Sequence, residues 1–319
     1  MSVVIGADLG GTKLSVAVCS GDGTILQQRV HALDGRGGVE AGAFVARAIA
    51  AEVEACAAID QPVISVGLCV PGIARPAGTV WAPNIDGWSD YPLRDEVSSA
   101  VGGLPVALAS DRTGYILGET WKGHAQGVDH AVYLAVGTGI GAGILVDGQI
   151  LEGSQGIAGA IGWMVLNAVK DDAGRALGSF ETQASGEGMV RQARRLLSER
   201  PGYSGVLLRE SGGALSTSDL FEAFDKDDPV AVEVIGGCIR LWGMAVANLV
   251  SLFNPQVVVL GGGVFGPAAR FLPEIRKEAE GWAQPVAFRQ TRIEVSALGG
   301  DAGLYGACRL AWDALYVND

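Results

Sequence analysis

Near its N-terminus the chain reads Ile5-Gly6-Ala7-Asp8-Leu9-Gly10-Gly11-Thr12-Lys13-Leu14-Ser15-Val16-Ala17-Val18. Two short apolar runs rich in β-branched residues flank a polar, glycine-rich turn, a pattern typical of two strands joined by a tight turn. Gly10 and Gly11 can adopt positive φ, which brings backbone N–H groups close to a bound group. Thr12, Lys13 and Asp8 add a hydroxyl, a cation and a carboxylate that can hold a metal ion or its water. Together these groups suit a nucleoside triphosphate with Mg²⁺.

Two familiar phosphate-binding turns do not match this stretch. A P-loop needs G-x-x-x-x-G-K-[ST] before a helix. Gly6 and Gly11 have that spacing, but Thr12-Lys13 is in the reverse order and a strand follows. A Rossmann turn also opens a helix, and its glycine pattern is absent. An ordinary hairpin turn stays an alternative, because turns are naturally rich in glycine.

The composition indicates one large or two medium folded domains, with 319 residues, 49% hydrophobic and 18% charged. The 48 glycines follow no collagen-like period, so we assign them to tight turns and close backbone packing. The formal net charge of -12 is usual for a cytosolic enzyme and argues against non-specific binding of nucleic acid. An anionic ligand must therefore be held by local features such as helix N-termini or single Lys and Arg residues.

The cysteines and the apolar runs suggest where the chain resides. The five cysteines are scattered and form no C-x-x-C pair, which favours reduced, buried thiols. No signal-peptide pattern precedes the first strand, and no apolar run reaches about 18 residues without charges or turn signals. We therefore expect a soluble, cytoplasmic protein with no membrane partner.

Two further glycine-rich segments follow predicted strands. Gly137-Thr138-Gly139-Ile140-Gly141-Ala142-Gly143 lies between predicted strands at 131–136 and 144–146, which repeats the design of the first turn and suggests duplicated halves that face one nucleotide. Gly261-Gly262-Gly263-Val264-Phe265-Gly266 matches G-x-G-x-x-G after a predicted strand at 257–260. A dinucleotide site would need this motif early, in a βαβ unit, so we interpret it as a backbone shelf for adenosine or phosphate.

Asp111 is the candidate general base. A predicted strand at 106–109 ends before Ser110-Asp111, and a predicted helix covers 113–122. Ligands of open α/β sheets lie beyond the carboxyl ends of strands, where a carboxylate can take a proton from an attacking hydroxyl. The alternative is that Asp111 is the N-cap of the helix.

The irregular stretch 71–94 is a candidate ligand loop, in which Asn84, Trp81 and Trp88 can line a polar ligand such as a sugar. The alternative is a plain surface loop. The remaining predicted elements are strands at 25–30, 63–70 and 293–297, helices at 40–58, 180–199, 219–225, 229–253 and 302–316, and loops at 152–165, 167–178 and 200–218.

Taken in order, these motifs resemble the ROK family of bacterial sugar kinases, within the actin/hexokinase/Hsp70-like superfamily, over nearly the whole chain. The residues that carry the resemblance are Asp8-Leu9-Gly10-Gly11-Thr12-Lys13, Pro71-Gly72, Pro83-Asn84 with Trp88, Asp111, the turn 137–143, Asn254-Pro255 and Gly261-Gly262-Gly263-Val264.

The resemblance implies an α/β fold of two ribonuclease-H-like (actin-like ATPase) domains flanking a cleft. The first would span residues 1–118 and be joined by the C-terminal helix 300–319, and the second, larger domain would span 119–299. ATP would lie across the glycine turns with the sugar deeper in the cleft. Closure would exclude water, which competes with the sugar for the γ-phosphoryl group. The family also suggests a homodimer or homotetramer.

Carried over residue by residue, the resemblance implies a role for each site residue. Asp111 becomes the base that activates the acceptor hydroxyl, and Asp8 becomes the ligand of Mg²⁺. The implied ATP-binding residues are Asp8, Gly10, Gly11, Thr12, Lys13, Gly137, Thr138, Gly139, Gly261, Gly262, Gly263 and Val264. The implied acceptor-binding residues are Gly72, Asn84, Ser110, Asp111, Trp163 and Glu181.

The sequence departs from the family at the sugar end. Ser110 stands where the family usually has Asn, and Ala160-Ile161-Gly162-Trp163 replaces the usual Glu-x-x-His. Residues 167–180 contain neither Cys nor His where the family has a zinc loop, so we predict no structural zinc. Trp163 offers a flat apolar face and one N–H donor. The acceptor pocket should be less polar than that of a glucokinase, which points to an amino sugar, a deoxysugar or a cyclitol.

The sequence therefore predicts an ATP-dependent kinase that phosphorylates a hydroxyl of a hexose, an amino sugar or a cyclitol. One alternative is a degenerate relative that binds nucleotide or sugar without catalysis, which the changes at Ser110, Ala160 and Trp163 support. Another is a sugar-binding regulator, but the core begins by residue 3 and the acidic charge disfavours DNA. The acceptor, the hydroxyl that is phosphorylated and the use of a donor other than ATP stay open.

Overall fold

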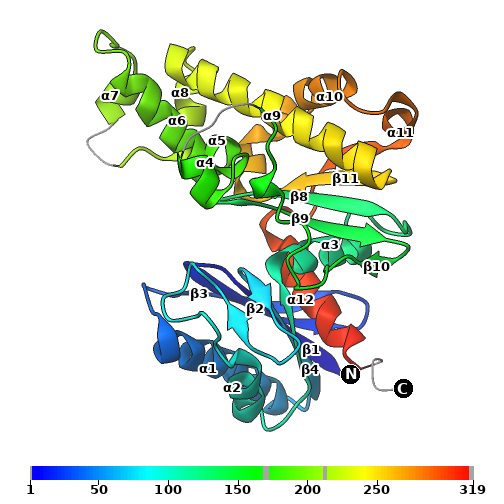
Figure 1. Cartoon of the computed structure of the whole chain (residues 1–319). Coiled ribbons are helices and arrows are strands. Elements are labelled where there is room, and N and C mark those ends of the chain that lie inside the picture. Colours follow the sequence, from blue (N-terminus) through cyan, green and yellow to red (C-terminus); the bar gives the residue numbers. More distant parts are fainter. Residues whose placement is uncertain (1, 168–171, 211–213, 316–319) are drawn as a thin grey trace. The chain divides into compact units, whose positions relative to one another are not determined.

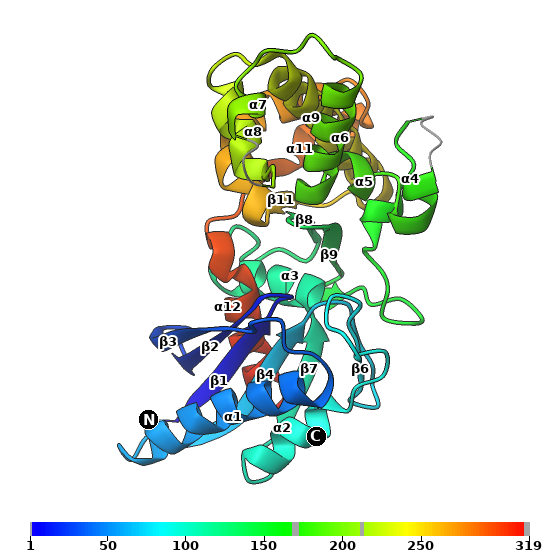
Figure 2. The ribbon, with the colours of Figure 1, turned by 90° about the vertical axis from the view of Figure 1, so that its left-hand side faces the viewer.

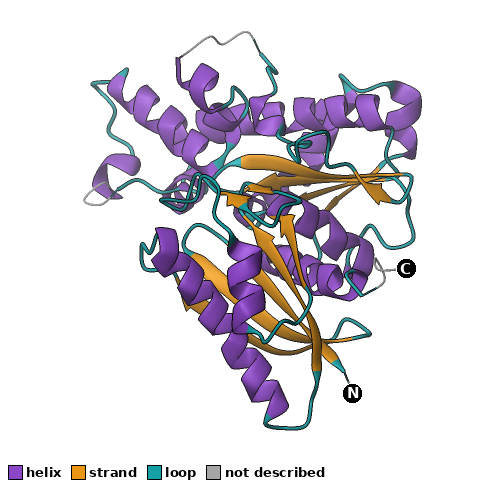
Figure 3. Cartoon of the chain, turned by 60° about the horizontal axis from the view of Figure 1, so that its bottom comes forward, coloured by secondary structure: helices purple, strands orange, loops and turns teal. Residues whose placement is uncertain are grey.

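The computed structural model describes residues 2–167, 172–210 and 214–315. The chain forms two compact units. The first consists of Met1–Val128, Gln149–Ala158 and Gly300–Asp319, and the second of Asp129–Gly148 and Gly159–Gly299. Each unit contains a five-stranded sheet covered by helices (Figure 3).

The first unit is built on a sheet in the order β3-β2-β1-β4-β7 (Figure 2). Its strands are β1 (Val3–Leu9), β2 (Lys13–Ser20), β3 (Ile25–Ala32), β4 (Val63–Val70) and β7 (Val106–Ser110), with a small hairpin of β5 (Ile73–Ala74) and β6 (Val80–Trp81). Strands β1, β2 and β3 are antiparallel neighbours, whereas β1, β4 and β7 run parallel.

Alternate residues of β1 face opposite layers of helices, as the two-residue period of a strand requires. Val3 and Ile5 pack in one cluster with α1 (Gly38–Ala57) and α2 (Leu93–Ala100). Val4 packs on the other face with Leu304 of α12 (Ala302–Asp313), which lies beside α3 (Asp111–Lys122) (Figure 1). The unit is therefore a sheet between two helical layers.

The second unit repeats this strand order as β10-β9-β8-β11-β12. Its strands are β8 (Ala131–Val136), β9 (Ile140–Val146), β10 (Gln149–Ile150), β11 (Val257–Gly261) and β12 (Arg292–Val295). Its helices are α4 (Asp172–Leu177), α5 (Glu181–Ala184), α6 (Gly186–Ser198), α7 (Leu207–Glu210), α8 (Thr217–Phe224), α9 (Pro229–Phe253), α10 (Leu272–Glu280) and α11 (Pro285–Gln290). Strand β8 is antiparallel to β9 and parallel to β11, as β1 is to β2 and β4. The predicted α/β fold with two ribonuclease-H-like sheets is confirmed.

Helix α9 is the centre of the core of the second unit. Asp228 caps it by accepting from the N–H groups of Val230 and Ala231, Pro229 stands at its first position, and Asn254 ends it in the left-handed conformation. By length and composition α9 is the one described helix that passes the test for a membrane span, but 61% of its apolar window is buried inside the protein. A core helix passes the same test, and α9 packs against α6, α8 and α10.

Several predicted boundaries are wrong. The helix expected at 180–199 is two helices, because Ser185 is extended and its hydroxyl caps α6 by accepting from the N–H of Gly188. The turn expected at 137–143 ends at Gly139, since β9 begins at Ile140. Helix α4 lies within the stretch 167–178 that was expected to be irregular, of which residues 168–171 lie outside the described part.

Other elements were missed or end elsewhere. Helices α2 and α11 had no prediction; α2, for example, buries only Leu93 and Val97 and so has a weak apolar pattern. Helix α12 ends at Asp313, and the predicted end of this helix at residue 316 lies outside the described residues. All five cysteines are free and buried, as predicted.

Glycines let α12 pack directly on the sheet and on α3. A Cβ atom at Gly6 would lie 2.3 Å from Cys308 Sγ, and one at Gly67 would lie 2.0 Å from the carbonyl oxygen of Ala307. A Cβ atom at Gly306 would lie 1.8 Å from the carbonyl oxygen of Gly114. Backbone atoms cannot move aside as a flexible side chain can, so these positions require glycine.

Gly306→Ala should therefore lower the free energy of unfolding by more than about 2 kcal/mol, because the added methyl group overpacks a rigid backbone contact. Urea denaturation measures the change. Gly300→Ala is the matched control, because a Cβ atom there would meet nothing within 4 Å, and its effect should stay within about 0.5 kcal/mol. Equal effects of the two substitutions would contradict the packing argument.

Candidate active site

The glycine turn between β1 and β2 is held by the backbone and leaves its polar side chains exposed. The N–H of Gly10 donates to the carbonyl oxygen of Lys13 at 2.8 Å, and the N–H of Leu33 donates to that of Thr12 at 2.8 Å. Gly11, Thr12 and Lys13 are exposed. A Cβ atom at Gly11 would lie 3.5 Å from Cβ of Asn84, so the structure brings this predicted acceptor residue next to the turn.

Asp8 is the next-to-last residue of β1, and the charges of Asp111, Lys13 and Asp301 act on its carboxyl. Burial, followed by the negative charge of Asp111, raises its pKa from 3.8 to about 7; Lys13 opposes the shift and Asp301 adds to it. A Cβ atom at Gly303 would lie 2.6 Å from Oδ2 of Asp8, so the first turn of α12 closes over this carboxyl. A bound cation would neutralise the negative charges of Asp8 and its acidic neighbours Asp111 and Asp301.

Mg²⁺ fits Asp8 as one ligand among several. Among the residues described, no group of three or more His, Cys, Asp or Glu side chains stands ready to hold a metal ion. Mg²⁺ commonly uses one or two carboxylates together with water and substrate phosphates, and needs no cage made entirely of protein. The predicted absence of structural zinc stays a prediction.

Asp111 is the first residue of α3, and Ser110 is its N-cap. The Ser110 backbone is extended, with φ -68° and ψ 154°, and its Oγ accepts from the N–H of Thr113 at 3.3 Å. The interpretation of Asp111 as the cap is therefore wrong. The Asp111 carboxyl accepts instead from the N–H of Arg112 at 2.8 Å and from the Tyr115 hydroxyl.

Opposing effects set the proton affinity of Asp111. Burial raises the pKa of its carboxyl above the usual 3.8, while the Arg112 charge and the hydrogen bonds from Arg112 and Tyr115 limit the rise. A carboxylate with a raised pKa is a stronger proton acceptor, which suits a general base. Its place beyond the end of β7 is where ligands of such sheets bind.

Gly72 and Arg112 connect the loop after β4 to α3. Gly72 has φ +94°, and a Cβ atom there would lie 2.2 Å from the carbonyl oxygen of Trp81, so no larger residue fits. The Arg112 guanidinium donates to the carbonyl oxygen of Gly72 at 3.3 Å. The sequence analysis missed Arg112, because nothing in the local pattern shows that its side chain reaches residue 72.

Trp88 does not face a ligand. Its side chain is 2% exposed, its indole N–H donates to the carbonyl oxygen of Gly38 at 3.0 Å, and its ring stacks on Tyr91 at 4.7 Å. The expectation that Trp88 lines a sugar is therefore wrong. Asn84 and Trp81, in contrast, are exposed. Trp88 is the buried anchor of the loop that carries them.

In the second unit, the turn after β8 and the segment after β11 lie side by side. The N–H of Gly137 donates to the carbonyl oxygen of Gly139 at 2.9 Å. Gly262 has φ +89°, and a Cβ atom there would lie 2.5 Å from the carbonyl oxygen of Val136. Gly261 packs on the Tyr133 ring, whereas a Cβ atom at Gly263 would meet nothing within 4 Å. Gly261 and Gly262 thus shape the backbone, and Gly263 is open to a ligand.

A pocket of about 820 Å³ joins these two glycine segments. Its lining residues are Gly137, Thr138, Gly186, Glu187, Val190, Arg191, Arg194, Leu215, Ser216, Thr217, Ser218, Phe221, Gly263, Val264 and Pro267. The N-terminus of α6 contributes Gly186, whose N–H donates to the carbonyl oxygen of Gly137 at 2.8 Å. The volume is within the range of small-molecule sites, and a helix N-terminus favours an anion. Of the predicted ATP-binding residues in this unit, Gly137, Thr138, Gly263 and Val264 line the pocket.

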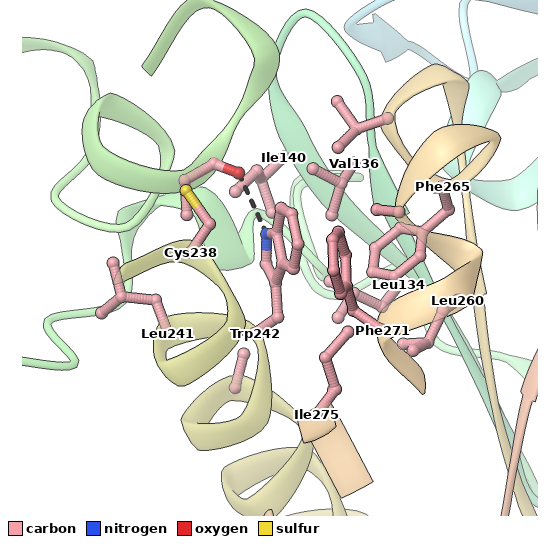
Figure 4. Close-up of a cluster of buried hydrophobic side chains, with 14 of the residues drawn as sticks. Leu134, Val136, Ile140, Cys238, Leu241, Trp242, Leu260, Phe265, Phe271 and Ile275 are labelled. Carbon is pink, nitrogen blue, oxygen red and sulfur yellow. Dashed lines mark hydrogen bonds between the residues drawn. The ribbon is translucent and has the colours of Figure 1, made fainter. Parts of the chain in front are cut away.

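Trp242, a buried residue of α9, contacts both segments that form the walls of the pocket. Its indole N–H donates to the carbonyl oxygen of Ala184, just before the Ser185 cap of α6, at 3.0 Å (Figure 4). Its ring also packs on Phe265, which follows Val264, with centroids 5.2 Å apart. One core side chain therefore positions both walls of the pocket.

Glu181 forms hydrogen bonds inside the second unit, whereas Trp163 lies exposed on its surface. Oε2 of Glu181 accepts from the N–H of Ile140 at 2.6 Å, and Cβ atoms at Gly139 and Gly162 would lie 2.7 Å and 2.9 Å from it. Burial raises the pKa of the Glu181 carboxyl, which the Ile140 N–H partly offsets. Glu181 thus holds the turn after β8 in place. Trp163 lies in a short 3₁₀ helix (Ile161–Trp163) and is 57% exposed, so its ring is accessible to a ligand.

Two ribonuclease-H-like sheets, each with a glycine turn after its first strand, define a protein of the actin-like ATPase class. The ROK family sequence profile matches residues 4–314. A glucokinase from Halalkalibacterium halodurans is 32% identical over 308 residues, which cover 95% of this chain and 92% of that protein. The chain belongs to the ROK family.

Two solved structures illustrate the range of this family. A ROK family glucokinase from Streptomyces griseus, in complex with glucose and AMPPNP, is similar with a TM-score of 0.79 and 33% identity, covering 98% of this chain and 99% of that one. A ROK family transcriptional regulator, a homologue of the E. coli MLC protein, is similar with a TM-score of 0.85 and 26% identity, covering 99% of this chain and 78% of the regulator. Kinases and regulators therefore share this fold.

Asp8→Asn should stabilise the metal-free protein, and more so at high pH. The folded pKa of about 7 exceeds the ordinary 3.8, so the stability that protonated Asp8 contributes is complete below pH 3.8 and is lost as the pH rises through 7. Asn imitates the protonated form at every pH. The interval corresponds to at most about 4 kcal/mol, an upper limit because the carboxyl is partly exposed.

Urea denaturation in EDTA at pH 5 and pH 8 measures this difference. The gain from Asp8→Asn should be larger at pH 8, whereas Asp60→Asn, in an exposed turn, should give the same small change at both pH values. A gain that does not depend on pH would show that burial of Asp8 carries no electrostatic cost.

Proposed function

We propose that this chain is an ATP-dependent kinase that transfers the γ-phosphoryl group to a hydroxyl of a sugar or sugar-like acceptor, with Asp111 as the general base. The observation that carries the proposal is the state of Asp111. Ser110 performs the capping of α3, which leaves the Asp111 carboxyl at the end of β7 with a raised pKa and no structural ion pair among the described residues. A carboxylate that only capped the helix would need neither a second capping residue beside it nor a buried position that raises its pKa.

The donor would bind in the pocket of the second unit. Gly137, Thr138 and Gly263 offer backbone groups to phosphates, and the N-terminus of α6 adds its dipole. Lys13 and the N–H groups of Gly11 and Thr12 would hold the transferred phosphoryl group, because the Gly10 N–H already donates within the turn. Mg²⁺ would be held by Asp8 together with the donor phosphates and would neutralise charge that develops on them. The glucokinase relatives support ATP and a sugar as the substrates.

Acceptor binding is assigned to the loops around Asp111. Gly72, Asn84, Ser110 and Asp111 come from the first unit, and Trp163 and Glu181 from the second. The domain boundaries at 118 and 299, the homodimer or homotetramer and the cytoplasmic location stay predictions.

A regulator is the second candidate, favoured by the similarity to the ROK family transcriptional regulator. The charge of -12 counts against direct contact with DNA phosphates. A regulator needs no general base, so the behaviour of Asp111 separates the two functions.

Asp111→Asn should lower kcat by a factor of at least about 100, because the amide cannot accept the hydroxyl proton. The KM for ATP should change less than threefold. Release of ADP from Mg-ATP is measured against hexoses, amino sugars, deoxysugars, cyclitols and sugar acids. Asp95→Asn, on the exposed first turn of α2, is the control and should retain activity. Turnover that survives in Asp111→Asn would remove the assigned base.

Arg191 and Arg194 should bind the nucleoside end of the donor. Both line the pocket, are exposed and form no ion pair with a described residue. Helix α6 rises about 1.5 Å per residue, so Arg194 lies about 12 Å along the axis from Gly186 at the phosphate turn. Alanine at either position should raise the KM for ATP about fivefold, which corresponds to about 1 kcal/mol.

Arg195→Ala is the matched control for these two variants. It lies on the same helix but pairs with Glu199 at 2.9 Å and does not line the pocket. Binding of ADP, measured by calorimetry, should weaken in the Arg191 and Arg194 variants and not in this one. Equal affinity in all three variants would place the nucleoside elsewhere.

A further inference from the structure

Arg112 carries a positive charge that no fixed carboxylate neutralises. Its guanidinium donates to the carbonyl oxygens of Gly72 at 3.3 Å, Gly156 at 3.4 Å and Ile157 at 3.5 Å. No carboxylate of a described residue forms an ion pair with its side chain, although Asp111 next to it responds to its charge. Five other arginines of this unit lie within 4.0 Å of a carboxylate, namely Arg29, Arg36, Arg75, Arg94 and Arg309, whereas Arg47 on α1, like Arg112, has no ion pair with a described residue.

The hydrogen-bonding capacity of Arg112 is also incompletely used. A guanidinium has five N–H donors, and its good hydrogen bonds to oxygen are about 2.7–3.2 Å long. All three contacts of Arg112 exceed that range. Arg94, which also donates to main-chain carbonyls, reaches Pro76 at 3.1 Å and Ala77 at 2.8 Å. Arg112 thus keeps donors for a better acceptor, and its planar fork matches a carboxylate or a phosphate.

Arg112 lies next to residues of the proposed acceptor site, so its positive charge is available to the acceptor rather than to the donor. It follows Asp111 directly and contacts Gly72, and both of these residues belong to the proposed acceptor site. Lys13, the cation that acts on Asp8, belongs to the glycine turn after β1. The loop that Arg112 reaches carries Glu152, whose side chain forms no ion pair with a described residue and leaves Arg112 unneutralised.

We propose that the acceptor is an anionic sugar, whose carboxylate or phosphate binds Arg112 while Asp111 takes the proton of a nearby hydroxyl. This inference rests on the proposed kinase function. The hydroxyl oxygen forms a bond to the γ-phosphorus, the bond from that phosphorus to the β,γ-bridging oxygen breaks, and ADP leaves with the electron pair. Asp111 and Arg112 are consecutive residues at the start of α3, and the Arg112 guanidinium reaches Gly72, so we assign both groups to one acceptor molecule.

An anionic acceptor differs from the amino sugar, deoxysugar or cyclitol that the sequence suggested. The ammonium group of an amino sugar would be repelled by Arg112, whereas a neutral hexose or cyclitol would leave its charge unpaired. A sugar acid or a sugar phosphate supplies the missing anion and satisfies the free N–H donors in one step.

The test compares anionic acceptors with neutral and cationic compounds related to them. Turnover is measured with D-glucuronate and D-gluconate as carboxylates, glucose 1-phosphate and glucose 6-phosphate as phosphates, and glucose, glucosamine and myo-inositol as non-anionic compounds. We expect kcat/KM for the best anionic acceptor to exceed that for glucose at least about 100-fold, which is about 2.7 kcal/mol. The carboxylate and phosphate arms show which anion is preferred.

Variants at position 112 separate binding from support of the loops. Arg112→Gln should raise the KM for the anionic acceptor at least about 30-fold and remove the preference for anionic over non-anionic acceptors, while the KM for ATP changes less than about threefold. Arg112→Lys should recover part of the loss, because it keeps the charge without the planar fork. Arg94→Gln is the matched control, since Arg94 also donates to main-chain carbonyls, and it should leave the preference for anions unchanged.

Two outcomes would overturn the inference. If a non-anionic acceptor is preferred and Arg112→Gln lowers all activities equally, Arg112 is a structural link between loops, and the kinase proposal stands. If no acceptor turns over, calorimetry with the same sugar acids and sugar phosphates decides the matter. Absence of binding in the presence of Mg-ADP then refutes the anionic acceptor, while lack of Mg-ADP binding itself refutes the kinase.

Discussion

The first unit depends on the contact of α12 with the backbone of its neighbours. Gly6, Gly67 and Gly306 have no side chain at the points of closest approach, so the helix can lie against β1, β4 and α3. The contact joins the last described helix to strands near the N-terminus, and the unit is complete only when both ends of the chain have folded. The same packing brings Gly303 against Asp8, so the contact that closes the fold also buries the carboxyl whose pKa is raised to about 7.

Strand order explains why functional residues that are far apart in sequence lie together. In the second unit β8 and β11 are parallel neighbours, so the segments that follow them emerge at one edge of the sheet and share a pocket. In the first unit β1, β4 and β7 are parallel neighbours in the same way, and they are followed by Gly10, Gly72 and Asp111. One topology, used twice, thus gathers two glycine segments at a pocket in one unit and brings Gly10, Gly72 and Asp111 to one edge of the sheet in the other.

The sequence predicted the elements that local chemistry determines. The β-branched run of β4 and the apolar run of β8 gave strands with correct ends, and the glycine turns were found because few other residues suit them. Features that depend on distant contacts were missed. Both Ser110 and Asp111 are good caps, and only the backbone conformation shows that Ser110 is the one used. The burial of Trp88 depends on Gly38, 50 residues away, which no local pattern reveals.

The three residues Ser110, Asp111 and Arg112 show how neighbouring positions can carry separate tasks. Because Ser110 satisfies the N–H of Thr113, the Asp111 carboxyl is free to accept from Arg112 and Tyr115, which keep its charged form accessible despite burial. The Arg112 side chain leaves Asp111 and reaches main-chain carbonyls, so it lowers the proton affinity of the carboxyl without forming an ion pair that would occupy it. A carboxylate locked to a cation would be a weak base, and one without a nearby cation would stay protonated. In Asp111 these effects oppose each other: burial raises the pKa of the carboxyl above the usual 3.8, and the Arg112 charge and the hydrogen bonds from Arg112 and Tyr115 limit the rise.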